Sequence, residues 1–158
     1  MKNILRLIML AVCFCLIFIQ PSFAKNNKKH EDKPPQVTVK KLGANPNGGN
    51  CVGYANSQVK NLPHGLNNEK DKENAINSYK PKKNTVAVID SAHSGEVGHV
   101  AVVKSVDNKG NKKSITIQET NFGYNGVQER TITGSNMKNI QGKVGIVGYI
   151  DPNKKKKK

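Results

Sequence analysis

The sequence predicts an α+β fold in which a short helix comes first and an antiparallel sheet of about five strands follows. Three observations lead to this class. Apolar residues recur at helical spacing directly after Cys51, five later segments have strand-like composition, and turns rich in Gly, Asn and Lys separate those segments. No alternation of strands and long helices suggests parallel β-α-β units.

The 158 residues are enough for one domain. Beyond the first 24 residues, every apolar side chain lies between Val37 and Ile150, which predicts a folded domain over 37–151. The charged and Pro-containing segment 25–36 reads as a disordered basic linker, and 152–158 as a basic Lys tail.

The first 24 residues have the organisation of a signal peptide. Lys2 and Arg6 precede the uncharged run 7–19, and the segment closes with small residues at Ser22 and Ala24. We therefore expect cleavage after Ala24 and a secreted or periplasmic, cell-wall-associated product with no transmembrane segment. A lipidated or uncleaved anchor is the alternative, although neither cysteine of this segment follows a small residue.

The mature chain would be strongly basic. The 26 Lys and Arg residues, less the two in the leader, against 11 acidic residues leave a net charge of +13. Only Cys51 remains after cleavage, so an internal disulfide is excluded and a monomer is expected. The absence of Trp, the scattered basic residues and the export signal all argue against a nucleic-acid partner.

Cys51 follows a turn-rich loop over 42–50 and opens the first predicted helix. Val52, Ala55 and Val59 recur at helical spacing, despite the glycine at position 53. A thiol at a helix N-terminus lies near the positive end of the helix dipole, which favours the thiolate.

The remaining elements follow in order. A second, exposed helix is predicted over 69–79, ended by Pro81, and a sheet after it. The predicted strands are Thr85 to Ile89, His99 to Val106, Ser114 to Asn121, Val127 to Thr133 and Val144 to Ile150.

A turn at 108–111 would fold two of these strands into a hairpin. If the numbers of paired residues sum to 218 or 220, His99 shares a sheet face with Glu119 and Asn121; if they sum to 219, it faces away. We expect the shared face, because the alternate apolar residues of each strand lead up to these polar ones. We also expect that face to meet the helix of Cys51.

Three segments resemble the motifs of the CHAP domains (cysteine, histidine-dependent amidohydrolases/peptidases). They are the nucleophile segment 49–55, the histidine strand 98–103 and the Glu-x-Asn segment 119–121. The segments 81–89 and 144–150 are similar to the strand before the histidine and to the closing strand, so the resemblance covers nearly all of 42–151. It implies a papain-like α+β fold and cleavage of an amide in peptidoglycan.

The resemblance also implies a role for each matching residue. Cys51 would be the nucleophile, His99 the general base, and Glu119 and Asn121 the groups that orient and polarise the imidazole. Asn50 and the backbone N–H of Cys51 would form an oxyanion hole. No metal and no other cofactor is expected.

Further polar and aromatic residues carry open alternatives. Tyr54 and Tyr124 are predicted to line a substrate groove, although core packing suits Tyr54 equally well. His93, Glu96 and His99 could be imagined as a metal site, but a Gly-containing loop fixes no ligand geometry between them.

Three functions remain in competition. The first is a peptidoglycan hydrolase, either an N-acetylmuramoyl-L-alanine amidase or a stem-peptide or cross-bridge endopeptidase. The second is a non-catalytic basic module that binds anionic wall polymers or lipid head groups through its charge and Lys tail. The third is another thiol hydrolase or transferase acting on small exported amides. Only the second would keep its activity after Cys51→Ala.

Overall fold

The computed structural model describes residues 33–45, 48–95 and 97–154. The predicted signal peptide, most of the predicted linker and the last four lysines lie outside the described residues. Among the described helices, none is long and apolar enough to cross a membrane.

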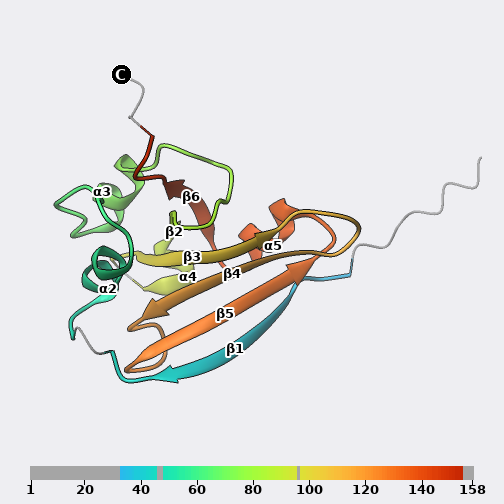
Figure 1. Ribbon diagram of the computed structural model, residues 1–158, viewed down its shortest axis with the longest axis horizontal. Helices are drawn as coiled ribbons and strands as arrows, with labels where there is room; N and C mark the ends of the chain where they lie inside the picture. The colour runs from blue at the N-terminus through green and yellow to red at the C-terminus, as the bar shows by residue number, and fades with distance from the viewer. Residues whose placement is uncertain (1–32, 46–47, 96, 155–158) are drawn as a thin grey trace, which may run out of the picture. The chain divides into compact units, whose positions relative to one another are not determined.

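The described chain is α+β, as predicted, with six strands in one antiparallel sheet (Figure 1). The strand order is β1-β5-β4-β3-β2-β6, so β1 and β6 form the edges. The strands are β1 (Gln36–Gly43), β2 (Val86–Ile89), β3 (His99–Asp107), β4 (Lys113–Thr120), β5 (Val127–Gly134) and β6 (Ile146–Ile150).

Short helices flank the sheet. They are α2 (Cys51–Gln58), α3 (Glu69–Asn74), α4 (Ser91–Ser94) and α5 (Met137–Lys143). Figure 1 shows α2 and α3 together at one end of the long strands, and α2 contacts both β3 and β4. In contrast, α5 packs against β4, β5 and β6.

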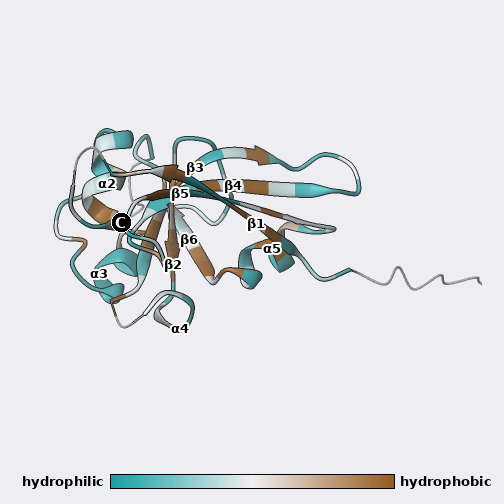
Figure 2. Ribbon diagram, turned by 90° about the horizontal axis from the view of Figure 1, so that it is seen from below, coloured by the Kyte–Doolittle hydropathy of each residue, from teal (hydrophilic) through white to brown (hydrophobic). Residues whose placement is uncertain are grey.

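The sheet has a hydrophobic cluster on each face, and the strands carry much of the hydrophobic colour in Figure 2. Val100 and Val102 of β3 pack with Ala55 of α2, whereas Ala101 and Val103 pack with Ile140 of α5. Successive strand residues point to opposite faces, so a strand covered on both sides must be apolar at every position. This explains the unbroken apolar runs of β2 and of the first half of β3.

Several elements differ from the sequence prediction. The edge strand β1, which begins one residue inside the predicted linker, was not predicted, and neither were α4 and α5. All eight residues of β1 are exposed, so it has no buried face to give a period-two apolar signal.

The helix predicted over 69–79 is shorter than expected, and it is not exposed at every position. The helix ends at Asn74, and Lys72 within it is buried. Asn77 and Ser78 instead donate backbone hydrogen bonds to Tyr149 O of β6, which draws this part of the chain out of the helix and onto the sheet edge.

A β-bulge at Lys104 divides the hairpin of β3 and β4 into two registers. Val103 pairs with Ile117, so the paired numbers sum to 220 on the His99 side. Ser105 pairs with Thr116, so the sum is 221 on the turn side. The extra residue lets the turn keep one register while the other end of the hairpin keeps a second.

The register on the His99 side is one of the two that the sequence analysis required. Extended to the strand ends, a sum of 220 sets His99 opposite position 121 and keeps its side chain on the face of Glu119. Without the bulge, the turn-side register would send the two side chains to opposite faces.

Candidate active site

Cys51 is the first residue of α2, and Asn50 caps that helix. The Asn50 side-chain Oδ1 accepts a hydrogen bond from the Gly53 N–H at 2.9 Å, and its backbone carbonyl accepts from the Tyr54 N–H. The cap leaves the N–H groups of Cys51 and Val52 without partners inside the helix. Cys51 is only partly buried, so part of its surface is accessible to a substrate.

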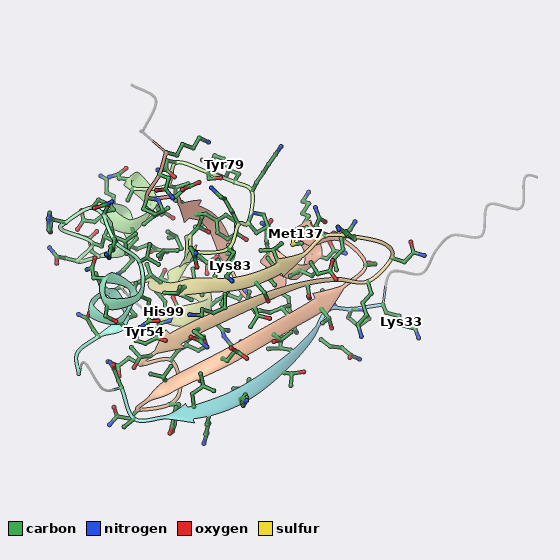
Figure 3. All side chains as sticks on the ribbon, in the orientation of Figure 1. Lys33, Tyr54, Tyr79, Lys83, His99 and Met137 are labelled. Atoms are coloured by element: carbon green, nitrogen blue, oxygen red, sulfur yellow. The ribbon has the colours of Figure 1, made fainter. Side chains whose placement is uncertain are left out.

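His99, labelled in Figure 3, is the first residue of β3. Only 3% of its surface is exposed. Its strand face is that of Ala101 and Val103, which packs against α5, whereas α2 packs on the opposite face. The expectation that this face would meet the Cys51 helix was therefore wrong. Residues 100–103 are all apolar, so the pattern could not tell the two faces apart. The thiol and the imidazole meet where α2 and β3 each begin.

Cys51 and His99 form a hydrogen bond and interact through their charges. Burial alone would raise the pKa of the Cys51 thiol, but the hydrogen bond and the charge of His99 outweigh it and hold that pKa below its ordinary value. Burial would likewise lower the pKa of His99, but its bonds to Cys51 and Glu119 raise it. Both shifts favour a thiolate–imidazolium pair.

Glu119 holds the other side of the imidazole ring. His99 Nε2 lies 3.1 Å from Glu119 Oε2, and the Glu119 side chain is fully buried. The carboxylate accepts a hydrogen bond from the Nε2–H group, so Nδ1 is the ring nitrogen left for the thiol.

Arg130 neutralises the buried carboxylate. Its Nη2 donates to Glu119 Oε2 at 2.9 Å, and its Nε forms an ion pair with Oε1 at 2.5 Å. Burial would raise the pKa of Glu119, but the His99 hydrogen bond and the Arg130 charge hold it below its ordinary value. Cys51, His99, Glu119 and Arg130 thus form a row of alternating charges in which no buried charge stands alone.

Gln128 and Phe122 close the site on the side of the β4–β5 loop. Gln128 donates from Nε2 to Glu119 Oε1 at 3.0 Å and to the Phe122 carbonyl at 2.7 Å. The Phe122 ring lies 5.1 Å from the His99 ring and stacks under the Arg130 guanidinium at 4.1 Å. The loop is therefore tied to the carboxylate and covers the imidazole.

The sequence analysis missed Phe122, Gln128 and Arg130. A signal was present in β5, where Gln128, Arg130 and Ile132 share one strand face. In the observed register Gln128 lies opposite Glu119, and Arg130 is its diagonal neighbour. Two long polar side chains in line with a buried isoleucine indicate a buried polar partner on the next strand.

Among the described residues, two of the predicted site residues, Asn121 and Tyr54, make no hydrogen bond to His99. Asn121 is exposed, adopts a φ of 58°, and makes no hydrogen bond to His99 among the described residues, so Glu119 is the group that contacts the ring. Tyr54 is 4% exposed within the α2 core cluster, and its hydroxyl donates to Gln118 at 3.2 Å. This is the core-packing alternative.

Tyr124 is the other aromatic residue that was predicted to line a substrate groove. It lies in the β4–β5 loop, half-buried, with the Lys41 ammonium 4.8 Å from the centre of its ring. A groove residue at this position would offer an aromatic face beside a positive charge.

His93 lies apart from this row of charges. Its Nδ1 contacts Asp90 Oδ1 at 2.7 Å, and its ring packs against Gly145 at the start of β6. Across residues 33–45, 48–95 and 97–154, no group of three or more His, Cys, Asp or Glu side chains could hold a metal ion.

The family model of the CHAP domain matches residues 41–121, just over half of the chain. That segment runs from the end of β1 to the residue after β4 and contains Cys51, His99 and Glu119. The search of curated proteins and the search of solved structures each gave no significant match.

Proposed function

The chain belongs to the CHAP domain family, and we propose that it is an exported peptidoglycan hydrolase that cleaves an amide bond through an acyl-enzyme on Cys51. The observation that carries the proposal is the row Cys51–His99–Glu119–Arg130. It joins a partly exposed thiol to a buried imidazole whose other nitrogen is held by a carboxylate. A thiol, a base and an orienting group are what acyl transfer requires.

The first half of the reaction uses the thiolate and the imidazolium. The Cys51 Sγ attacks the carbonyl carbon of the amide and forms a tetrahedral oxyanion. His99 then gives its Nδ1 proton to the leaving nitrogen as the C–N bond breaks, which leaves a thioester on Cys51 and a neutral His99. Glu119 keeps the ring in the orientation that this transfer needs.

The second half uses the neutral imidazole as a general base. His99 takes a proton from water, the hydroxide attacks the thioester carbonyl, and the thiolate leaves with the imidazolium restored. The product is a free carboxylate.

The oxyanion would be held at the start of α2. The backbone N–H of Cys51 has no partner inside the helix and lies at the positive end of the helix dipole. Asn50 caps the helix through its Oδ1, so its side-chain NH₂ group remains the second donor. One residue thus serves both the cap and the oxyanion hole.

The net charge and the leader sequence support a polyanionic substrate outside the cell. Peptidoglycan and the polymers attached to it are anionic, and a protein of strongly positive charge concentrates on such a surface. We therefore place the protein in the periplasm or outside the cell, bound to the wall, with Tyr124 at the edge of the substrate groove.

The test mixes the protein lacking residues 1–24 with purified sacculi and identifies the soluble fragments by mass spectrometry. The matched control is Cys51→Ala. Free lactyl groups would identify an N-acetylmuramoyl-L-alanine amidase, and new peptide amines an endopeptidase. Release that is equal in both proteins, or binding to sacculi without release, would reject the hydrolase and favour the basic binding module.

A further inference from the structure

Helix α3 contains a buried lysine that lies close to the candidate active site. Lys72 is only 2% exposed, although its neighbours on the helix are charged and polar and α3 is coloured as hydrophilic in Figure 2. Lysine is almost never buried to this degree without a specific partner. The helix lies against β3, and its buried ammonium points into the protein.

The ammonium of Lys72 holds the backbone just before His99. Its Nζ donates to the Val97 carbonyl at 2.6 Å and lies 3.5 Å from the Gly98 carbonyl. Hydrogen bonds from a charged donor are stronger and shorter than neutral ones. The two carbonyls belong to the residues that lead into β3, so Lys72 fixes the point at which the histidine strand begins.

Glu69, one turn earlier on α3, makes one contact with Ser91 at the start of α4 and a second with Gly98. Its Oε1 accepts a hydrogen bond from the Ser91 N–H at 2.6 Å. Its Cβ would lie 3.2 Å from a Cβ added at Gly98, whose φ is 63°. Only glycine suits this conformation and this close approach. The helix is therefore packed directly against the residue that precedes His99.

The charge of Lys72 also acts on the thiol. Burial raises the pKa of Cys51, and the charged groups that lower it are His99 of β3 and Lys72 of α3. A second cation matters most in the half of the cycle when the imidazole is neutral and no longer balances the leaving thiolate.

We propose that Lys72 is a positioning residue of the active site, which holds the Val97 and Gly98 carbonyls so that His99 meets Cys51, and whose positive charge also acts on the thiolate. The inference rests on the proposed function for its meaning in catalysis. The state of the thiol, however, can be measured without any substrate.

The experiment follows the rate of Cys51 alkylation by iodoacetamide against pH. Lys72→Met removes the charge and the hydrogen bond, Lys72→Gln removes the charge and keeps a donor, and Lys72→Arg keeps both. The matched control is Lys70→Met, the same substitution at an exposed position of the same helix. Circular dichroism and thermal unfolding establish which variants are folded.

Lys72→Met and Lys72→Gln are expected to move the alkylation profile to higher pH and to slow alkylation at neutral pH severalfold. Lys72→Arg should restore most of the loss, and Lys70→Met should match the unmodified protein. If Lys72→Met does not fold, the comparison of Lys72→Gln with Lys72→Arg decides. A native profile in folded Lys72→Gln, or equal shifts in the Gln and Arg variants, would overturn the proposal.

The outcome is independent of wall hydrolysis. Shifted profiles in a protein that releases nothing from sacculi would reject the proposed function and keep the role of Lys72 in the site. Cys51-dependent release together with native alkylation profiles in the Lys72 variants would support the proposed function and reject the role of Lys72.

Discussion

Cys51 and His99 titrate as a coupled pair, so each pKa belongs to the two residues together. The thiol pKa is lowered and the imidazole pKa is raised, mainly by their mutual hydrogen bond acting against burial. The reactive thiolate–imidazolium pair exists at pH values between the thiol pKa and the imidazole pKa. Activity should therefore rise with pH through the lowered thiol pKa and fall through the raised imidazole pKa, which gives a bell-shaped profile.

The first prediction concerns the thiol alone. Cys51 should react with iodoacetamide at a pH where an ordinary thiol is still protonated, and His99→Ala should move that reaction to higher pH, because the hydrogen bond and the charge are lost. Stopped alkylation followed by intact-mass measurement checks this. Alkylation profiles that match a free thiol in both proteins would show that Cys51 and His99 do not form an ion pair.

The second prediction concerns the buried carboxylate. Glu119→Gln should lower kcat/KM by roughly 10²–10⁴-fold, since an amide cannot stabilise the imidazolium and cannot fix its tautomer in the same way. It should also destabilise the fold by about 3–5 kcal/mol, because Arg130 keeps its charge without a counterion.

The matched control for this change is Glu129→Gln. Glu129 lies on β5 and accepts a hydrogen bond from Gln118, but it does not touch the imidazole. The activity and stability of Glu129→Gln should stay near those of the unmodified protein. Near-native kinetics in folded Glu119→Gln would show that the carboxylate does not orient His99.

At this scale the sequence analysis brought together the proposed catalytic residues but not the residues that support them. Cys51, His99 and Glu119 could be connected because Cys51 is the one cysteine outside the predicted signal peptide and because one hairpin register joins His99 to Glu119. Arg130 could not be predicted, since it depends on the register of a second hairpin, and Lys72 depends on a helix that was expected to be exposed.

Among the elements, α2 begins with the proposed nucleophile, and the residue that caps it, Asn50, is proposed to act both in folding and in catalysis. Asn50→Asp keeps an acceptor for the Gly53 N–H but removes the NH₂ donor. This variant should keep the stability of the unmodified protein and have a lower kcat. Asn50→Ala should lose kcat and, in addition, about 1 kcal/mol of stability.

Kinetics and thermal unfolding of the two variants check this third prediction, with Asn136→Ala as the control. Asn136 caps α5 in the same way, through the Asn139 N–H, on the other face of the sheet. Asn136→Ala should lower the free energy of unfolding by about 1 kcal/mol and leave kcat unchanged. Unchanged kcat in Asn50→Asp would remove the side chain from the oxyanion hole.

The five strands with alternating or continuous apolar residues were predictable to within two residues, because burial imposes that pattern. The elements that were missed have little such pattern. β1 has no buried residue, α4 has four residues, and α5 buries only Ile140. Their formation depends on contacts with the sheet, which a single sequence does not reveal.

Across the whole molecule, the buried charge row should make stability depend on pH. The folded-state pKa of Glu119 is lowered from an ordinary value of 4.5, so the stability it contributes is present above that value and is lost as the pH falls through the folded-state pKa. The pKa of His99 is raised from 6.5, so its contribution is present below that value and is lost as the pH rises through the folded-state pKa.

This fourth prediction is checked by thermal unfolding from neutral pH down to about pH 3. The unmodified protein should lose more stability on acidification than Glu119→Gln, which has no carboxylate to protonate at that site. Parallel curves for the two proteins would mean that Glu119 has the same pKa in the folded and unfolded states.

The most direct test of the central claim is the mass of the enzyme stopped in acid during turnover of a soluble peptidoglycan fragment. Thioesters survive such a quench, so a covalent intermediate can be weighed and located. The account predicts an adduct equal in mass to the acyl part of the fragment, carried by the peptide that contains Cys51, and no adduct in Cys51→Ala. Turnover by Cys51→Ala at the native rate, with no adduct on the unmodified protein, would contradict it.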